Sequence, residues 1–141
     1  LLALGATIKT NTRSLSAEDF FTGLFETALD EGEMVTAVEF TAPEKSGYSK
    51  FRNPASRYAM TGVFVCKHGD GSVGVGVAGA GSDGAFRSSE METALAGDFT
   101  SAALETISID SSDLMSDMHA SAEYRANLIK VMGKRAVQQA E

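Results

Sequence analysis

Cationic and aromatic side chains gather in one short stretch of the chain. Lys50, Arg52 and Arg57 lie close in sequence to Phe51 and Tyr58. Such a set can hold a cofactor that has an aromatic ring and phosphate groups, because the ring stacks on tyrosine while a cation opposes the negative charge. A salt-bridged hairpin on an acidic protein would use the same residues. The pattern by itself leaves both interpretations open.

Glycines form two overlapping Gly-x-Gly-x-x-Gly matches. A dinucleotide site of this type needs a strand before the first glycine and a helix that starts at the last one. The first match lies inside a predicted strand, and no helix begins directly after the second. Close packing and a flexible loop therefore explain these glycines better than nucleotide binding does. The matches are Gly74, Gly76 and Gly79, then Gly79, Gly81 and Gly84.

The histidines and the single cysteine indicate neither a metal site nor a nucleophile. His68 lies in a predicted turn and His119 lies before the last predicted helix, and neither has a cysteine or histidine at ligand spacing. Cys66 is the only cysteine, so the chain can form no internal disulfide and can hold no iron–sulfur cluster by itself. Its apolar neighbours predict a buried thiol, with a reactive thiol as the alternative.

The composition is that of a globular protein with an acidic balance. Of the 141 residues, 43% are hydrophobic and 22% are charged, and the net charge is −7. This charge argues against nucleic acid or an anionic membrane as the main partner. No apolar run is long enough to cross a bilayer and no signal-peptide pattern is present, so we expect a cytoplasmic protein. The chain opens without methionine inside an apparent strand, which favours a fragment of a longer protein.

The first part of the chain is expected to hold two strands and a short helix. Residues 1–12 alternate loosely, as a strand that runs into a turn would. Ser16 with the acidic residues after it predicts a helix N-terminal cap. Alternation over residues 33–40 predicts the second strand. A polar linker follows, and we place the domain boundary between Ala42 and Pro43.

The second part of the chain reads as strands followed by helices, which is an α+β arrangement. A His-Gly-Asp-Gly turn separates the second and third of three predicted strands. In the third strand valines line one face and glycines the other, so another backbone or a helix can approach the glycine face closely. The predicted strands cover residues 48–51, 59–67 and 72–80, and the predicted helices cover residues 88–95, 101–106 and 122–139, with an irregular acidic loop at 107–118.

The last predicted helix is amphipathic. Its apolar residues recur at the spacing of one helix face, so we expect that face to pack on the sheet. The predicted face consists of Tyr124, Leu128, Val131, Met132 and Ala136.

Several segments together resemble one known family. They occur in the same order as in the FAD-binding medium subunit of molybdenum hydroxylases, of the carbon monoxide dehydrogenase and xanthine dehydrogenase type. The resemblance spans nearly the whole chain, and segments that would be weak alone are fairly specific in register. The segments are residues 19–29, 32–38, 48–51, 55–63, 119–125 and 134–136.

The resemblance implies a flavin subunit that works with two partners. Residues 1–42 would be the end of the second flavin-binding lobe, and residues 43–141 would be a C-terminal domain with a three-stranded antiparallel sheet and a helical bundle. A large subunit would hold the molybdenum cofactor and a small subunit two [2Fe–2S] clusters. FAD on the medium subunit would pass electrons to an external acceptor. The resemblance leaves the substrate and the acceptor open.

The resemblance also assigns residues to the flavin. Val35 would contact the flavin or adenine side, and Tyr58 would lie against the isoalloxazine. Lys50 or Arg52 would supply positive charge near the ring or the phosphates, while Arg57 stands where relatives carry arginine or aspartate. The family's glycine-rich FAD segments lie upstream of this sequence, so we expect the chain alone to bind FAD weakly or not at all. The alternatives are a non-catalytic subunit-docking module and a free-standing ligand-binding domain.

Overall fold

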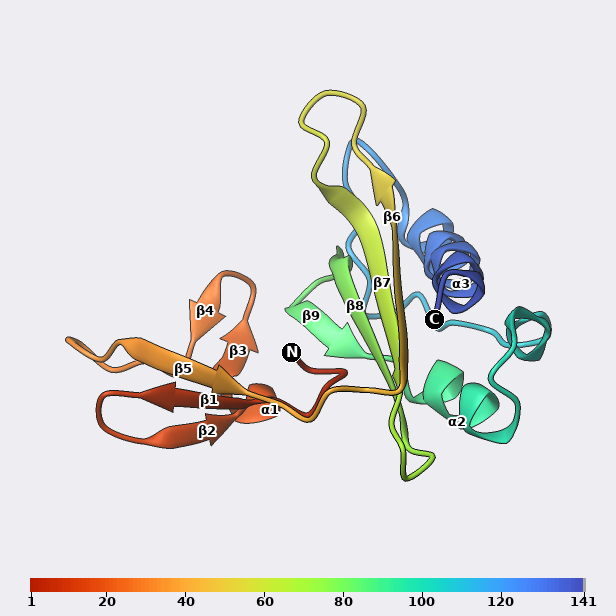
Figure 1. Cartoon of the computed structure of the whole chain (residues 1–141). Coiled ribbons are helices and arrows are strands. Elements are labelled where there is room, and N and C mark those ends of the chain that lie inside the picture. Colours follow the sequence, from red (N-terminus) through yellow and green to blue (C-terminus); the bar gives the residue numbers. More distant parts are fainter. Residues whose placement is uncertain (141) are drawn as a thin grey trace.

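The computed structural model describes residues 1–140 and shows an α+β fold, which confirms the predicted class (Figure 1). The strands form one four-stranded sheet, one three-stranded sheet and a two-stranded hairpin. The strands are β1 (Thr7–Thr10), β2 (Ser14–Ser16), β3 (Phe21–Gly23), β4 (Glu26–Thr27), β5 (Val35–Glu39), β6 (Lys45–Arg52), β7 (Ala59–Lys67), β8 (Val73–Gly81) and β9 (Gly84–Arg87). The helices are α1 (Ala17–Phe20), α2 (Ser89–Gly97) and α3 (Ala122–Gln138), with a 3-10 turn at Ser101–Leu104.

The larger sheet is antiparallel, with strand order β6-β7-β8-β9. The predicted turn joins β7 to β8, and Gly71 takes the positive φ that this turn requires. The sequence pattern predicts three strands here, and the structure adds a fourth. β9 is only four residues long and begins at Gly84, so it has too little alternation to be recognised from the sequence.

One face of this sheet carries the helices and the main hydrophobic core. Figure 1 shows α2 and α3 on the same side of the sheet. Alternate valines of β7 and β8 point into this core, as expected for strands with one covered face. Fully buried members include Val63, Val65, Val75 and Val77 from the sheet, and Met91, Leu95, Leu104, Ile129 and Met132 from the helical side.

Helix α3 crosses β6 and β7 in close contact. A Cβ on Gly47 would overlap the backbone carbonyl of Ala136, so only glycine allows this approach. The predicted face of α3 is correct in part: Leu128, Met132 and Ala136 are buried, whereas Tyr124 is exposed. The buried face is centred one residue further along the helix than predicted. It contains Arg125, Leu128, Ile129, Met132, Gly133, Ala136 and Val137.

The opposite face of the sheet receives the start of the chain. Residues 1–5 form turns instead of the predicted strand, and β1 begins only at Thr7. A Cβ on Gly74 would overlap the carbonyl oxygen of Ala3, and the thiol of Cys66 donates a hydrogen bond to that oxygen at 3.3 Å. The glycine face thus accepts a close backbone, as the strand pattern predicts.

The rest of the N-terminal part forms a small lobe beside the sheet, at the left of Figure 1. Its three-stranded sheet has the order β2-β1-β5, and the hairpin β3–β4 stands next to it. Ser16 caps α1 by accepting a hydrogen bond from the Asp19 amide at 3.0 Å, which confirms the predicted cap. Within residues 1–140 no helix has the length and apolar character needed to span a membrane.

The approach of α3 to β6 can be tested with a pair of glycine substitutions. Gly47→Ala should lower the free energy of unfolding by about 1–3 kcal/mol, because the new methyl group must push α3 away from the sheet. Gly97→Ala is the matched control, since its Cβ would meet nothing and alanine favours a helix by up to about 1 kcal/mol. Urea unfolding of both variants measures the difference. Equal stability of the two variants would contradict the packing described here.

Candidate functional site

The structure brings four of the five predicted site residues together at one end of the larger sheet. Lys50 and Arg52 lie at the end of β6, while Arg57 and Tyr58 lie in the loop that leads into β7. Arg52 pairs with Ala59 across the two strands. We call residues 50–59 the tip; the loop within it stands at the top of Figure 1. A strand–turn–strand unit is what the sequence predicts here.

The three cations of the tip have no acidic partner. Among residues 1–140, the side chains of Lys50, Arg52 and Arg57 form no salt bridge and no hydrogen bond. The interpretation as a salt-bridged hairpin is therefore wrong for the part of the chain described. Cations elsewhere do pair with carboxylates, namely Lys9, Arg13, Arg87, Arg125 and Lys134. The tip thus concentrates unpaired positive charge on a protein whose net charge is −7.

Asn53 shapes the loop of the tip. Its side-chain oxygen accepts hydrogen bonds from the amides of Ala55 and Ser56 at 2.9 and 3.1 Å. The backbone N–H of Asn53 donates to the carbonyl of Tyr58 at 2.9 Å. Asn53 is buried, and such local bonding is a known role of asparagine in turns. The Asn-Pro pair in the sequence is a turn signal, but it does not reveal that the backbone of Asn53 binds that of Tyr58.

An apolar hollow lies between the tip and the hairpin β3–β4. Its volume is about 760 Å³, within the range of small-molecule pockets. Tyr58, which is 49% exposed, lines one side, and Leu24 and Phe25 line the other. Further lining residues are Phe21, Gly23, Glu26, Thr27, Ala59, Gly79, Gly81, Gly84, Ala85, Met115 and Arg125.

Two residues near this hollow, Phe25 in its lining and Arg57 next to Tyr58 in sequence, have unusual backbone angles. Phe25 has φ +63° and Arg57 has φ +62°, and they are the non-glycine residues with positive φ among residues 1–140. Phe25 is also 98% exposed, although its ring is apolar. Positive φ at a bulky residue costs about 1–3 kcal/mol, and such strain clusters at functional sites. The hollow and the tip therefore form the candidate site.

Val35, the fifth predicted residue, lies in the small lobe and not in the tip. It is the first residue of β5, and β5 runs toward the larger sheet in Figure 1, so Val35 is at the far end of the strand. The side chain is 38% exposed. The structure therefore does not bring Val35 to the other four residues, and any shared ligand would have to be long.

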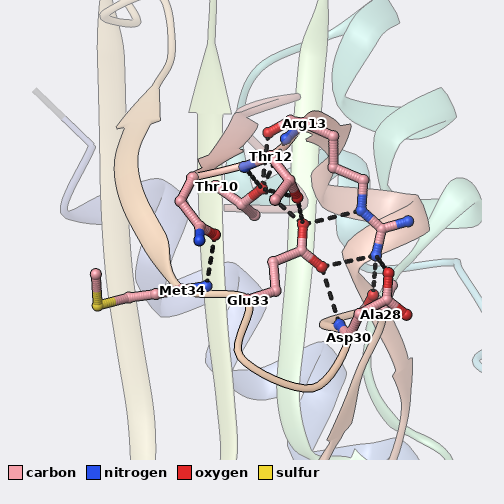
Figure 2. A network of polar contacts seen from close by, with 8 residues as sticks. Thr10, Thr12, Arg13, Ala28, Asp30, Glu33 and Met34 are labelled. Atoms are coloured by element: carbon pink, nitrogen blue, oxygen red, sulfur yellow. Dashed lines mark hydrogen bonds and ion pairs between the residues drawn. The ribbon is translucent and has the colours of Figure 1, made fainter.

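A network of charged and polar groups holds the start of β5 (Figure 2). Glu33 lies at its centre with a side chain that is only 2% exposed. Arg13 binds both carboxylate oxygens of Glu33, at 2.9 and 2.8 Å, and the Thr10 hydroxyl donates at 2.6 Å. Hydrogen bonding from Arg13, then Thr10, the Asp30 amide and Thr12, holds the pKa of Glu33 well below its usual range. The network fixes the loop immediately before Val35.

Cys66 and the acidic residues form no metal centre. Among residues 1–140, no group of three or more histidine, cysteine, aspartate and glutamate side chains could hold a metal ion. Cys66 is fully buried, as predicted, and burial raises the pKa of its thiol. Its sulfur lies 3.8 Å from the Nε2 atom of His68.

Comparisons with known proteins find the same fold in oxidoreductases. Quinoline 2-oxidoreductase from Pseudomonas putida 86 is similar over 97% of this chain, with 23% identity and a TM-score of 0.74. Reconstituted CO dehydrogenase from Oligotropha carboxidovorans is similar over 98%, with 26% identity and a TM-score of 0.75. The cyanide-inactivated form of Cu,Mo-CO dehydrogenase is similar over 97% of this chain, with 26% identity and a TM-score of 0.68.

These similarities establish the fold and relate it to molybdenum hydroxylases. The chain spans about half the length of each neighbour, with 52% of the quinoline 2-oxidoreductase chain and 53% of each CO dehydrogenase chain covered. No protein-family model and no curated protein sequence matches the chain.

The Glu33 network predicts a pH-dependent stability. A carboxylate whose pKa is lowered on folding stabilises the protein above its unfolded pKa, about 4.3 for glutamate, and this stability is lost as the pH falls further. Glu33→Gln should therefore lower the melting temperature at neutral pH and flatten its fall below about pH 4.3. Glu31→Gln is the control, because it removes the same charge from an exposed glutamate two residues away. Equal melting temperatures of both variants across this pH range would show that the Glu33 network does not contribute pH-dependent stability.

Proposed function

We propose that the chain is part of the flavin subunit of a molybdenum hydroxylase, in which FAD relays electrons from iron–sulfur clusters to an external acceptor. The observation that carries this proposal is the fold shared with CO dehydrogenase over 98% of the chain at 26% identity. The division into residues 1–42 and 43–141 belongs to the proposal, and the separate pairing of β1, β2 and β5 supports it.

The candidate site suits the ring end of FAD. Its unpaired cations, half-exposed tyrosine and apolar hollow are groups that would contact an isoalloxazine and its negative charge. No helix among residues 1–140 begins at a glycine-rich, phosphate-binding loop. Helices α1, α2 and α3 each follow a serine, at Ser16, Ser88 and Ser121, and not a glycine-rich loop. We therefore assign the pyrophosphate contacts to a segment other than this chain.

Four residues of the tip have roles in this proposal. Bound FAD would supply the redox chemistry, accepting electrons and passing them on. Tyr58 would pack against the ring, while Lys50 and Arg52 would favour the reduced, anionic form by their positive charge. Arg57, with its strained backbone, would direct Tyr58 toward the hollow. Val35 would contact the cofactor from the small lobe, at a distance from the ring.

The partners in this proposal are a large subunit with the molybdenum cofactor and a small iron–sulfur subunit. Large apolar side chains on the surface support contacts with other polypeptides. This observation also favours the second candidate function, a docking module that binds these subunits without FAD of its own. The most exposed apolar residues are Phe25, Met34, Phe40 and Met118.

Flavin content of the assembled complex separates the two candidates. The complete flavin subunit that contains this chain is produced together with both partner subunits, and the purified complex is examined by visible absorbance. A stoichiometric flavin spectrum is expected if the proposal holds. A stable complex that contains molybdenum and iron but no flavin would instead identify a docking module.

Tyr58→Ala tests the ring contact within that complex. Loss of one aromatic contact, worth about 1.4 kcal/mol, should weaken FAD retention about tenfold and change the flavin absorbance. Tyr48→Ala serves as the control, because Tyr48 is similarly exposed but lies outside the tip and does not line the hollow. Titration of the apoprotein with FAD measures the affinity. An unchanged affinity and spectrum in Tyr58→Ala would remove Tyr58 from the flavin site.

A further inference from the structure

We propose that Arg125 of α3 is a positioning residue, which fixes Tyr58 at the hollow by tying the ends of β7 and β8 to the loop before α3. This inference rests on the proposed function, because it concerns how the ring contact of Tyr58 is placed. Arg125 is 1% exposed and lines the same hollow as Tyr58.

The guanidinium of Arg125 joins three separate segments. Its Nη1 atom donates to the carbonyl of Met60 at 2.7 Å and to the carbonyl of Gly79 at 2.9 Å. Its Nη2 atom donates to a carboxylate oxygen of Asp117 at 2.9 Å. Met60 belongs to β7, Gly79 to β8, and Asp117 to the loop that leads into α3. One side chain therefore fixes the relative position of all three segments.

Arg125 binds these two carbonyls just beyond the last paired residues of β7 and β8. Pairing of β7 with β8 ends at Gly62 and Ala78. Gly79 then adopts φ +79°, and a Cβ there would overlap the carbonyl of Ala59. The Met60 carbonyl is buried and also accepts a hydrogen bond from the Thr61 hydroxyl at 2.9 Å, while Gly79 is exposed. Arg125 thus ties β7 to β8 with one side chain where the regular pairing of the two strands has ended.

Tyr58 is held from both sides by this arrangement. On one side, the Asn53 amide donates to the Tyr58 carbonyl at 2.9 Å. On the other, Met60 is anchored by Arg125, only two residues along the chain. The short backbone segment between these anchors has little freedom, so Arg125 determines where the ring of Tyr58 lies relative to the hollow.

Two terms in the free energy of folding disfavour an arginine at position 125. A cation in the first turn of a helix opposes the helix dipole, and its burial requires desolvation. Its Nε atom has no hydrogen-bond partner among the described residues. A buried ion pair can often be replaced by apolar residues without loss of stability. The geometry that Arg125 imposes on β7 and β8 gives it a role beyond stability.

Asp117 is itself fixed before it meets Arg125. Its Oδ1 atom accepts hydrogen bonds from the amides of His119 and Ala120, at 2.9 and 3.1 Å. The His119 amide is the main cause that lowers the pKa of Asp117, with Ala120 and Arg125 adding to it. The carboxylate therefore stays ionised at neutral pH and gives Arg125 a rigid partner.

The test is a double-mutant cycle on the flavin potential of the complete complex. Arg125→Lys keeps the charge, but a single ammonium cannot reproduce the planar fork that spans three acceptors. We expect it to change the ratio of affinities for oxidised and reduced flavin about tenfold, a shift of about 30 mV for two electrons. In the Tyr58→Ala background the same substitution should shift the potential no further, because the group that it positions is gone.

Readouts on the chain itself separate positioning from general stability. In Arg125→Lys, hydrogen exchange of the Arg57 and Tyr58 amides should increase, while exchange in the core of β7 stays unchanged. Arg135→Lys is the matched control, since Arg135 is an exposed arginine on the same helix. If Arg125→Lys does not fold, Asp117→Asn weakens the same anchor while the Met60 and Gly79 bonds remain, and the same readouts apply.

The outcomes distinguish this inference from the proposed function. A potential that moves in Tyr58→Ala but not in Arg125→Lys overturns the positioning role and leaves the flavin site intact. Additive shifts in the double variant also overturn it, because Arg125 would then act independently of Tyr58. A potential that moves in neither variant overturns the flavin site, and the inference with it.

Discussion

The packing of α3 across β6 and β7 is the interaction on which the rest of the structure depends. Gly47 permits the backbones to touch, and the buried face of the helix supplies a large share of the core. Near its N-terminus the same helix carries Arg125, which donates to the carbonyls of Met60 in β7 and Gly79 in β8. The element that builds the core therefore also sets the geometry of the candidate site.

The second constraint is the docking of the small lobe on the opposite side. Residues 1–5 lie on the glycine face of β8, and Arg87 of β9 pairs with Glu18 at 3.1 Å. A Cβ on Gly84 would come 3.2 Å from the carbonyl of Gly23, so β9 and the hairpin β3–β4 also lie close together. The hollow arises between parts of the chain that are distant in sequence. Neither lobe alone contains both of its walls.

Local patterns predicted the elements more successfully than they predicted the site. Alternation identifies β7 and β8, and the turn between them, because one covered face imposes a strict period. The same reasoning misses β9, which is too short, and shifts the buried face of α3 by one residue. Arg125 stands three and four residues before Leu128 and Ile129, on the buried stripe. A charge at that position is a signal for a buried ion pair, but its partners come from tertiary structure.

The residues of the tip could be selected from the sequence, whereas their environment could not. The lack of acidic partners for Lys50, Arg52 and Arg57 depends on how the whole chain folds. The same is true of the separation between Val35 and the tip, since Val35 was assigned by family resemblance alone, which carries no information on distance. Phe25 was not predicted at all, because an exposed aromatic with positive φ leaves no periodic trace.

The central claim, that the tip and the hollow receive the flavin ring, is tested most directly by an NMR titration of this chain with lumiflavin. Lumiflavin contains the ring without phosphates, so it reports on the ring contacts alone. The account predicts saturable chemical-shift changes confined to the tip, the hairpin β3–β4 and the ring of Tyr58. Saturable shifts that map elsewhere on the chain and leave Tyr58 and the hairpin β3–β4 unchanged would contradict it.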